Sequence, residues 1–535
     1  MAGGAAIDQP TSLAITNLLD PRPWWKNSRL IFLNLWILLL LITSYTNGYD
    51  GSMMNGLQIL DQWTGAMGHP TGGKLGLLNA IQNIGALAAT PIAPYVTDGI
   101  GRKLAIIWGA SLMIAGTAVQ SAAQSVGMFT GARFLIGFGL TFAANAAPLL
   151  VSELAYPPHR APLVSTYNSL WYSGSIVAAW TTFGTFRINS QWAWRIPSIL
   201  QGLPSVLQVI LIWFCPESPR WLVSKGKEEK ALRILAYYHG RGNDQDPLVQ
   251  FEYNEIKEAI ELDKEISKTV GWTTLFATPG NRRRMRIIIA LAFFSQWSGN
   301  GLVSYYLNLV FDSIGITDAL TQTLINGILQ IFNLLVALIA SSLCDRAGRR
   351  VLFLSSNVGM LVFFVAQTIC FAQNAITGSK AAGHGVIAFI FLFYGAYDIA
   401  YTPLIVSYTV EILPYALRAK GFTVFNFMIS LALIFNQYAN PIALGSIGWK
   451  YYIVYDCVLA FEIVFMFFYC VETKNRTLEE TAALFDGEDK VEMITAKAAT
   501  RIGFEQALGR GSAADDKLED HEAYTEKHEH EHAQV

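Results

Sequence analysis

An aspartate and an arginine are the two residues of this sequence whose types and positions most directly suggest chemistry. Asp50 follows an uncharged run from Leu30 to Tyr49, which is long enough to cross the roughly 30 Å hydrocarbon layer of a bilayer as a helix. Arg133 is the only Arg or Lys within an apolar run of this length. A charge inside a membrane is costly unless it is paired, so both residues are functional candidates.

The two charges are expected at similar depths, because the run that ends at Asp50 and the run that contains Arg133 cross the membrane in opposite directions. Arg133 lies roughly 8 Å into its helix at a rise of 1.5 Å per residue. One interpretation is a static ion pair that ties two helices together. The other is a proton switch, in which protonation of Asp50 frees Arg133 and loosens the outer half of the protein. The residues alone leave both interpretations open.

The elements that position these charges follow from composition and hydropathy. The 535 residues are 52% hydrophobic and only 15% charged, whereas soluble domains are about 25% charged. We therefore expect an all-α membrane protein, because helices satisfy their own backbone in lipid. Twelve apolar segments are each long enough for one crossing. They are 30–49, 75–96, 104–123, 128–151, 163–185, 196–215, 287–310, 324–343, 351–372, 386–410, 422–442 and 451–470.

The distribution of Lys and Arg predicts the orientation. Most of the 38 basic residues lie in segments that are cytoplasmic if both termini are inside, as the positive-inside rule requires. A charged segment with two amphipathic stretches separates six spans from six. The predicted parts are a cytoplasmic N-terminal segment 1–29, a six-helix bundle 30–215, a cytoplasmic linker 216–286, a second bundle 287–470 and a largely disordered cytoplasmic tail 471–535.

The two halves repeat each other. DGIGRK at 98–103 recurs as DRAGRR at 345–350, and PES at 216–218 is echoed by VET at 471–473. The equal orientation of both copies indicates a parallel repeat, whose two bundles can rock about a central site. The charges of the repeats are either simple anchors or a cytoplasmic gate, and acids at fixed offsets favour the gate. The predicted gate residues are Asp98, Arg102, Glu153, Arg160, Glu217, Arg220, Asp345, Arg349, Glu411, Arg418 and Glu472.

Neutral polar and aromatic residues are spread over several spans. A sugar needs hydrogen-bonding groups around its rim and an aromatic surface for its C–H faces. Any single Asn is more often a helix–helix hydrogen bond than a ligand contact, but the distribution over the fifth, seventh, eighth, tenth and eleventh spans favours a site. Gly299 and Gly301 interrupt the seventh span, which predicts an irregular helix that lines a cavity.

Several motifs resemble the sugar porters of the major facilitator superfamily from about residue 30 to 480. They are GARFLIGFG (131–139), SELAYPPHR (152–160), PESPRWLVSKGKEEKA (216–231), EILPYALRAKG (411–421) and VETKNRTLEE (471–480). Two further stretches, 166–185 and 296–311, resemble the fungal group that includes lactose permease-like and cellodextrin-type carriers. This resemblance implies the major facilitator fold. It also favours the proton switch, because proton-coupled members have Asp and Arg at the positions of Asp50 and Arg133.

The resemblance also implies where a sugar would bind. The family's sugar contacts fall on Asn168, Gln296, Asn333 and the stretch Tyr401–Pro403, with departures such as Val406 where a Trp is common. These departures put a monosaccharide such as glucose in doubt. The predicted substrate-binding residues are Asn168, Trp171, Gln296, Asn300, Asn333, Tyr401 and Asn426, and Asp398 in the tenth span is a second candidate for proton coupling.

The expected function is uptake of a sugar together with protons across the plasma membrane by alternating access. Its partners are a small sugar, protons and the lipid bilayer, and a net charge of −2 gives no reason to expect nucleic acid. Two alternatives remain: a nutrient sensor on the same fold, and a carrier of another small metabolite. No catalytic triad or metal-ligand spacing is present in the sequence, so neither an enzyme nor a cofactor is expected.

Overall fold

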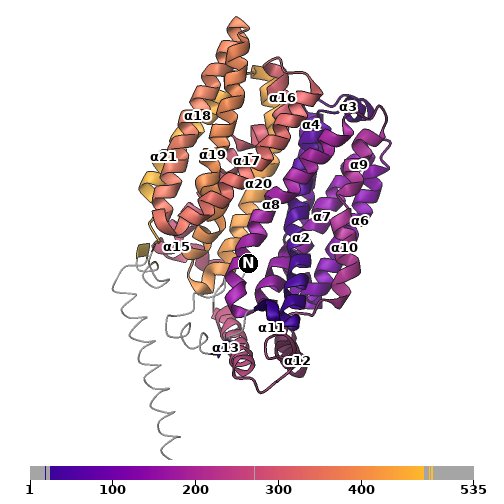
Figure 1. Ribbon diagram of the computed structural model, residues 1–535. Coiled ribbons are helices and arrows are strands. Elements are labelled where there is room, and N and C mark those ends of the chain that lie inside the picture. Colours follow the sequence, from indigo (N-terminus) through magenta and orange to yellow (C-terminus); the bar gives the residue numbers. More distant parts are fainter. Residues whose placement is uncertain (1–17, 20–23, 270, 475–480, 482–483, 486–535) are drawn as a thin grey trace, which may run out of the picture.

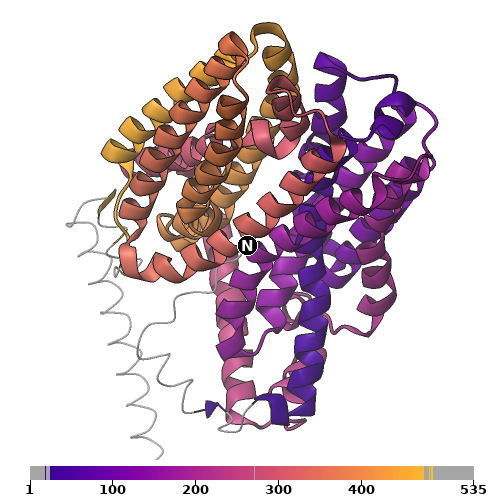
Figure 2. The same cartoon turned by 45° about the horizontal axis from the view of Figure 1, so that its top comes forward.

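The computed structural model describes residues 18–19, 24–269, 271–474, 481 and 484–485, apart from some side chains within helices. Two sets of long helices stand side by side, one from each half of the chain (Figures 1 and 2). In this part of the chain the regular structure is helical. Twelve membrane spans result, as the apolar segments predict.

The first half supplies six spans. They are α2 (Ser28–Leu57), α4 and α5 (Gly72–Ala89 and Ala93–Ile100), α6 (Arg102–Ser121), α7 (Val126–Leu154), α8 (Pro157–Thr185), and α9, α10 and η2 (Trp192–Leu200, Leu203–Leu211 and Ile212–Phe214). The pair α4 and α5 is bent by 51°, at Pro91, which cannot donate a helical hydrogen bond. Two short helices, η1 (Trp24–Lys26) and α3 (Asp61–Ala66), flank α2.

The second half supplies the other six. They are α15 and α16 (Pro279–Trp297 and Asn300–Ser313), α17 (Ala319–Ala347), α18 (Arg349–Thr377), α19 (Lys380–Glu411), α20 (Tyr415–Ile447) and α21 (Lys450–Tyr469). Most spans are recognisable by length and hydropathy alone. The exception is α8, whose many Ser, Thr and Tyr residues reduce its hydropathy although it is long enough to cross.

The linker between the halves folds into α11 (Pro219–Ser224), α12 (Glu228–Tyr238), α13 (Pro247–Thr269) and α14 (Thr274–Ala277). Helices α11 to α13 lie at one end of the molecule, which is at the bottom of Figure 1. We call this end the linker side and the opposite end the far side. The linker is anchored to the first half, since the ring of Tyr237 lies under the Arg29 guanidinium of α2 (4.6 Å) and Leu248 joins the first half's apolar core.

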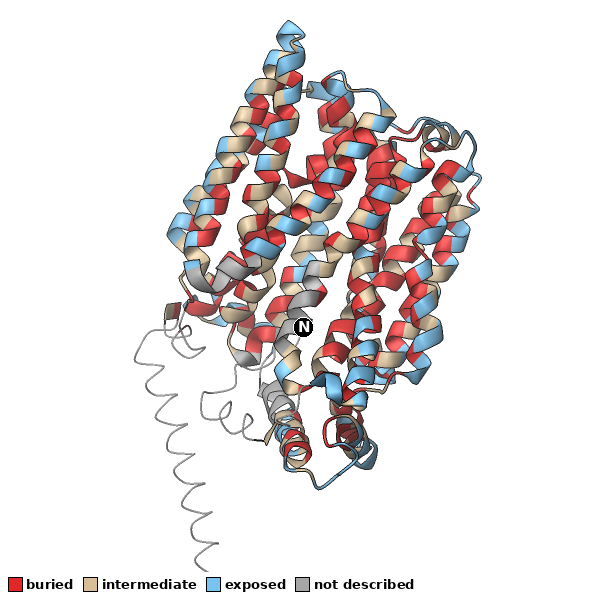
Figure 3. Ribbon diagram, viewed as in Figure 1, coloured by how far each residue is buried: buried red, intermediate tan, exposed pale blue. Residues whose placement is uncertain are grey.

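Buried residues line the helix faces that meet their neighbours, and exposed residues lie on the outer faces and at both ends (Figure 3). Many exposed residues within the spans are large and apolar, such as Leu38, Ile369 and Phe468. Lipid covers such faces in a membrane protein, so they need no partner helix. The second half has one large apolar core. The first half has a large core toward the linker side, a second toward the far side that also includes Tyr306 of α16, and a small cluster between α4, α5 and α7.

Candidate functional site

A cavity of about 360 Å³ lies between the two halves. Its wall is formed by α2, α4, α7 and α8 of the first half and by α15, α16, α17, α19 and α20 of the second. The amide and aromatic side chains of this wall are Asn47, Asn79, Gln82, Asn83, Trp171, Tyr172, Gln296, Asn300, Tyr305, Gln330, Asn333, Tyr394, Tyr397, Tyr401 and Gln437. This chemistry suits an uncharged ligand with many hydroxyl groups and apolar faces.

The break between α15 and α16 shapes the second half's part of the wall. Gly299 adopts a left-handed conformation (φ 101°), which glycine tolerates at little cost. The interruption frees backbone carbonyls, and side chains satisfy them. The amide of Asn300 and the hydroxyl of Tyr397 donate to the carbonyl of Ser295 (3.0 and 2.8 Å), and Asn436 donates to that of Gln296 (2.7 Å). The irregular seventh span predicted from its glycines is thus confirmed.

Asp50 and Arg133 come together beside the cavity. The Asp50 carboxylate is completely buried and lies 3.6 Å from Nη1 of Arg133, which is longer than a direct hydrogen bond. The amide groups of two glutamines donate hydrogen bonds to the carboxylate instead. Gln201 donates to Oδ1 at 2.5 Å and Gln82 donates to Oδ2. A buried charge held in this way has both an opposite charge and hydrogen-bond donors, which is what its burial requires.

Gln82 connects the carboxylate to the arginine and to the cavity. Its Nε2 donates to Asp50, its Oε1 accepts from Nη2 of Arg133 at 2.6 Å, and it lines the cavity together with Arg133. Close packing of α4 on α7 fixes this position, because a Cβ on Gly137 would lie 1.9 Å from the Gln82 carbonyl oxygen. Gln82 therefore touches both the acid and the space where a ligand fits.

Asp398 lies behind the opposite wall and joins the two halves. It is completely buried. Its Oδ1 accepts hydrogen bonds from the hydroxyl of Tyr172 in the first half and from Thr402 one turn along α19, both at 2.6 Å. Both donors line the cavity. A ligand that moves either hydroxyl would change the hydrogen bonding of Asp398.

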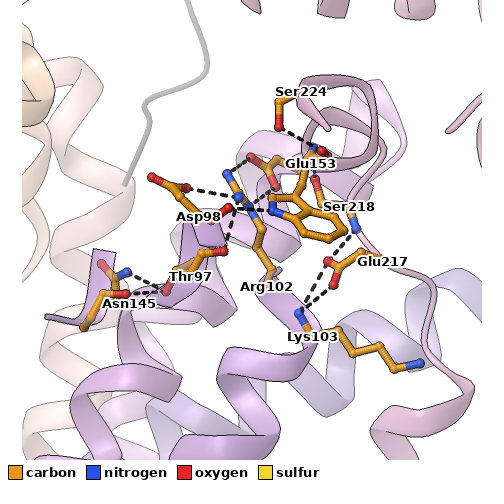
Figure 4. A network of polar contacts seen from close by, with 11 residues as sticks. Thr97, Asp98, Arg102, Lys103, Asn145, Glu153, Glu217, Ser218 and Ser224 are labelled. Atoms are coloured by element: carbon orange, nitrogen blue, oxygen red, sulfur yellow. Dashed lines mark hydrogen bonds and ion pairs between the residues drawn. The ribbon is translucent and has the colours of Figure 1, made fainter. Parts of the chain in front are cut away.

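A polar network occupies the linker side of the first half (Figure 4). Arg102 at the start of α6 pairs with Glu153 and Asp98, each at 3.1 Å. The carboxylate of Glu217 accepts from the backbone amide of Lys103 (3.2 Å). Burial raises the pKa of Glu217 above its usual value, although nearby backbone donors oppose the shift. This network joins three segments that are far apart in sequence.

The second half has a corresponding network. Arg349 pairs with Glu411 at 3.1 Å, and Glu472 accepts from the backbone amides of Arg349 (2.9 Å) and Arg350 (3.0 Å). Burial would raise the pKa of Glu472, but these backbone donors prevail and lower it. The side chain of Asp345 lies outside the described residues.

The other predicted gate residues have different surroundings. Arg160 lies 3.8 Å from Glu252 of the linker helix α13, so it ties the linker to the first half. Arg418 is buried at the start of α20, and Arg220 lies in α11. The ion pairs described above lie within one half or between a half and the linker.

Comparison with known proteins gives the family. Residues 36–485 match the family described as "Sugar (and other) transporter", which is most of the chain. The chain belongs to this family. The protein is accordingly a multi-pass membrane transporter.

Relatives within the sugar transporter family are moderately similar. The MFS-type transporter oryC of Aspergillus oryzae is 29% identical over 81% of each chain. A high-affinity glucose transporter of Kluyveromyces lactis is 27% identical over 81% of each. A probable quinate permease of Neosartorya fischeri is 28% identical over 84% of this chain and 87% of its own.

Solved structures share the fold. The inward-open xylose transporter XylE from E. coli superposes with a TM-score of 0.72 at 21% identity, over 85% of this chain and 100% of XylE. The proton:xylose symporter XylE bound to 6-bromo-6-deoxy-D-glucose superposes with a TM-score of 0.68 at 23% identity, over 85% and 99%. The protein thus has the major facilitator fold of twelve transmembrane helices.

Most of the residues that we predicted at the substrate site line the cavity of this sugar transporter family member. They are Trp171, Gln296, Asn300, Asn333 and Tyr401. The side chain of Asn168 lies outside the described residues. Asn426 is a correction, because it is exposed and does not line the cavity. It shares a face of α20 with Leu433, which does line the cavity, but lies about 10 Å nearer the linker side at 1.5 Å per residue.

Asp50 requires a second correction. The sequence predicts that it ends its helix, but α2 continues from Ser28 to Leu57 and holds Asp50 inside. The apolar run stops at Tyr49, while the helix continues because neighbouring spans satisfy the polar groups that follow. Sequence analysis also missed Gln82 and Gln201. The only available signal was an amide side chain within a membrane span, which is costly without a partner. This signal is not specific, because Asn79 and Asn83 lie in the same span as Gln82, and Gln208 lies in the same span as Gln201.

Proposed function

We propose that this protein takes up a sugar together with protons by alternating access. In this proposal the two bundles are 30–215 and 287–470, both termini and the linker side are cytoplasmic, and the membrane is the plasma membrane. The names of two relatives, a glucose transporter and a quinate permease, support a polyhydroxylated substrate. The asymmetry of Lys and Arg supports the orientation.

The proposed coupling between protonation of Asp50 and substrate binding rests on one observation. Gln82 lines the cavity and at the same time donates to Asp50 and accepts from Arg133. Protonation of Asp50 removes the charge that Gln82 and Arg133 hold in place. Their donors then become available to a substrate hydroxyl. Nε and Nη1 of Arg133 already have no hydrogen-bond partner among the described residues, so the arginine can bind a ligand without first breaking other hydrogen bonds.

Contacts between the halves support alternating access. On the far side, Asn55 of α2 accepts from the amide of Leu307 (3.1 Å), and Gln58 donates to the carbonyl of Tyr305 (2.9 Å). Nearby, Asn83 of α4 donates to Gln437 of α20 (2.7 Å). Toward the linker side, by contrast, Asn426 of α20 is exposed. It lies on the same face of α20 as Leu433, which lines the cavity. This arrangement corresponds to a state that is closed on the far side.

The substrate class follows from the wall of the cavity. A volume of about 360 Å³ lies in the range of small-molecule sites. We assign the protein to the fungal group of lactose permease-like and cellodextrin-type carriers, because the stretches that resemble this group contribute Trp171, Gln296 and Asn300 to the wall. A disaccharide is then the first substrate to test. A polyhydroxy acid such as quinate is the second candidate, favoured by the unpaired donors of Arg133.

The test is uptake of a panel of radiolabelled sugars and quinate in transporter-null cells, with and without a protonophore. We expect accumulation of at least one sugar above its external concentration, and collapse of that gradient on adding the protonophore. Accumulation that resists the protonophore would contradict proton coupling. Binding without uptake of any compound would instead favour a nutrient sensor.

A substitution sharpens the test. Asp50→Asn keeps the shape of the side chain but cannot carry a charge. We expect it to lower the accumulation ratio to about one while counterflow exchange persists, because exchange needs no net proton movement. The matched control is Asp61→Asn, which alters an exposed acid on the far side. An Asp50→Asn variant that still concentrates substrate would refute the proton role of Asp50.

A further inference from the structure

A groove runs along the outer surface of the second half beside α15, and α21 forms the opposite wall of part of it. One part, of about 570 Å³, is lined by Phe276, Pro279, Arg282, Arg286 and Ile289. A second part, of about 440 Å³, shares Arg286 and Ile289 and continues between the two helices. We call both parts together the α15–α21 groove. We propose that this groove binds an anionic phospholipid from the linker-side leaflet of the membrane.

The basic end of the groove lies where α15 begins, on the linker side. Arg282 and Arg286 are exposed and lie one helical turn apart. Neither forms an ion pair with an acid of the described chain. Arg286 donates to the carbonyl of Arg282 in its own helix (3.4 Å) and lies over the ring of Tyr469 at 5.6 Å. Two unneutralised guanidinium groups at the membrane surface are a binding site for a phosphate group.

The neighbouring arginine has a different role. The guanidinium of Arg283 lies over the ring of Phe485 at 5.5 Å, and Arg283 does not line either part of the groove. The arginines at the start of α15 therefore have different surroundings and do not form one continuous basic patch. Two of its members face the groove, and a third contacts the segment that follows α21.

The remainder of the groove is apolar. Moving along α15 away from Arg286, the wall consists of Ala290, Phe293, Phe294 and Trp297, faced by Phe461 and Phe465 of α21. The rings of Phe294 and Phe465 pack edge to face at 5.3 Å. The groove is thus charged at the membrane surface and apolar toward the membrane centre, which is the polarity of a phospholipid.

Aromatic anchors fix the depth of the basic end. Trp272 and Phe276 precede α15 and are both exposed, and Phe276 lines the basic part of the groove. Exposed aromatic rings of this kind lie at the headgroup level of a bilayer. Arg282 and Arg286 are therefore at the height of the lipid phosphates. In the orientation proposed above, on which this step rests, the linker-side leaflet is cytoplasmic and carries the anionic lipids. The two arginines then select an anionic headgroup over a zwitterionic one.

The experiment uses the purified full-length chain in detergent after lipid removal. Native mass spectrometry measures retention of phosphatidylserine and of phosphatidylcholine with identical acyl chains. We expect preferential retention of phosphatidylserine by the wild type. The double variant Arg282→Gln and Arg286→Gln should lose roughly tenfold or more of this affinity, since each basic residue near the surface contributes about a factor of five.

Two controls separate the proposal from a general charge effect. Arg283→Gln removes one charge from the same run and should retain phosphatidylserine as the wild type does. Ala290→Phe fills the apolar part and should reduce retention of phosphatidylserine even with both arginines present, which also tests the proposal should the double variant fold poorly. Equal retention by wild type and either groove variant would overturn it. So would an equal loss in Arg283→Gln, or full displacement of the lipid by glycerol 3-phosphate, which has no acyl chain.

Discussion

The two buried carboxylates beside the cavity have opposite kinds of partner. Asp50 lies within the first half, where a guanidinium and two glutamines surround it. Asp398 lies in the second half, where its hydrogen-bond partners among the described residues are two hydroxyl groups, one of which comes from the other half. The first arrangement stabilises a charge. The second ties the conformation of Asp398 to the distance between the halves.

This difference suggests a division of labour. The first half has the ionic chemistry, in Asp50 and Arg133, whereas the second half has most of the neutral polar residues of the cavity wall. Protonation of Asp50 would change the charge of the first half, while the second half holds most of the ligand's contacts. The cavity wall, to which both halves contribute, can then couple protonation to ligand binding. Gln82 and Tyr172 of the first half each line that wall and donate a hydrogen bond to a buried carboxylate.

The largest effect should come from removing the arginine alone. Arg133→Leu leaves the carboxylate of Asp50 buried without its opposite charge, and breaking a buried pair in this way costs about 3–5 kcal/mol. We expect a large loss of thermal stability in detergent. The double variant Asp50→Asn with Arg133→Leu should recover most of it, because the uncompensated charge is gone.

Arg187→Leu is the matched control for this substitution, since Arg187 is exposed on the far side over the rings of Phe183 and Phe186. It should change stability little. If Arg133→Leu proved as stable as the wild type, Asp50 would not depend on the arginine for its charge, and the contrast between the two carboxylates would fail.

A smaller effect is expected from the bond between the halves. Tyr172→Phe removes the hydroxyl that donates to Asp398 and leaves the bond from Thr402. A hydrogen bond contributes about 0.5–1.5 kcal/mol to stability, here only in the conformation in which the halves touch. The variant should therefore populate the state that is open on the far side more often. The rate at which an impermeant thiol reagent modifies Asn47→Cys, a position in the cavity wall, measures this opening.

Tyr397→Phe is the control, because the Tyr397 hydroxyl donates to Ser295 within the second half (2.8 Å). It loses a similar bond without separating the halves, so its labelling rate should match that of the parent. Equal acceleration in both variants would mean that Tyr172 acts through local packing and not through the contact between halves.

The spans could be predicted because length and hydropathy determine them. The break at Gly299 was also predictable, since two glycines among polar residues in a span indicate an interruption. Asp50 was misplaced to the end of its helix, because a hydropathy pattern records where apolar residues stop and not where helical hydrogen bonds do.

Partners across the bundle were not predictable. Gln201 reaches Asp50 from the sixth span, and Tyr172 reaches Asp398 from the other half. No local pattern in the sequence links such pairs, because the contact depends on how the helices pack. Arg133 was an exception, because it is the only Arg or Lys within the twelve apolar segments of the sequence. It was therefore the one candidate in those segments for the charge opposite Asp50.

The repeated acids Glu217 and Glu472 provide a second comparison, with the smallest expected effect. Burial raises the pKa of Glu217, whereas backbone donors outweigh burial and lower the pKa of Glu472. A lowered folded-state pKa contributes stability above the usual value near 4.5 that is lost as pH falls through the lowered pKa. A raised one has the opposite sign, so its contribution is lost as pH rises from about 4.5 through the raised value.

Glutamine substitutions separate the two acids. At pH 7, Glu472→Gln should destabilise the protein by about 1 kcal/mol, a modest value because the side chain is only half-buried and water screens it. Glu217→Gln should be neutral or slightly stabilising, since the fold already disfavours the charge. Thermal midpoints between pH 3 and 7 measure both, and the gap between wild type and Glu472→Gln should narrow below about pH 4.5. Equal losses at pH 7 would mean that the two copies of the repeat hold their acids alike, in spite of the different donors around them.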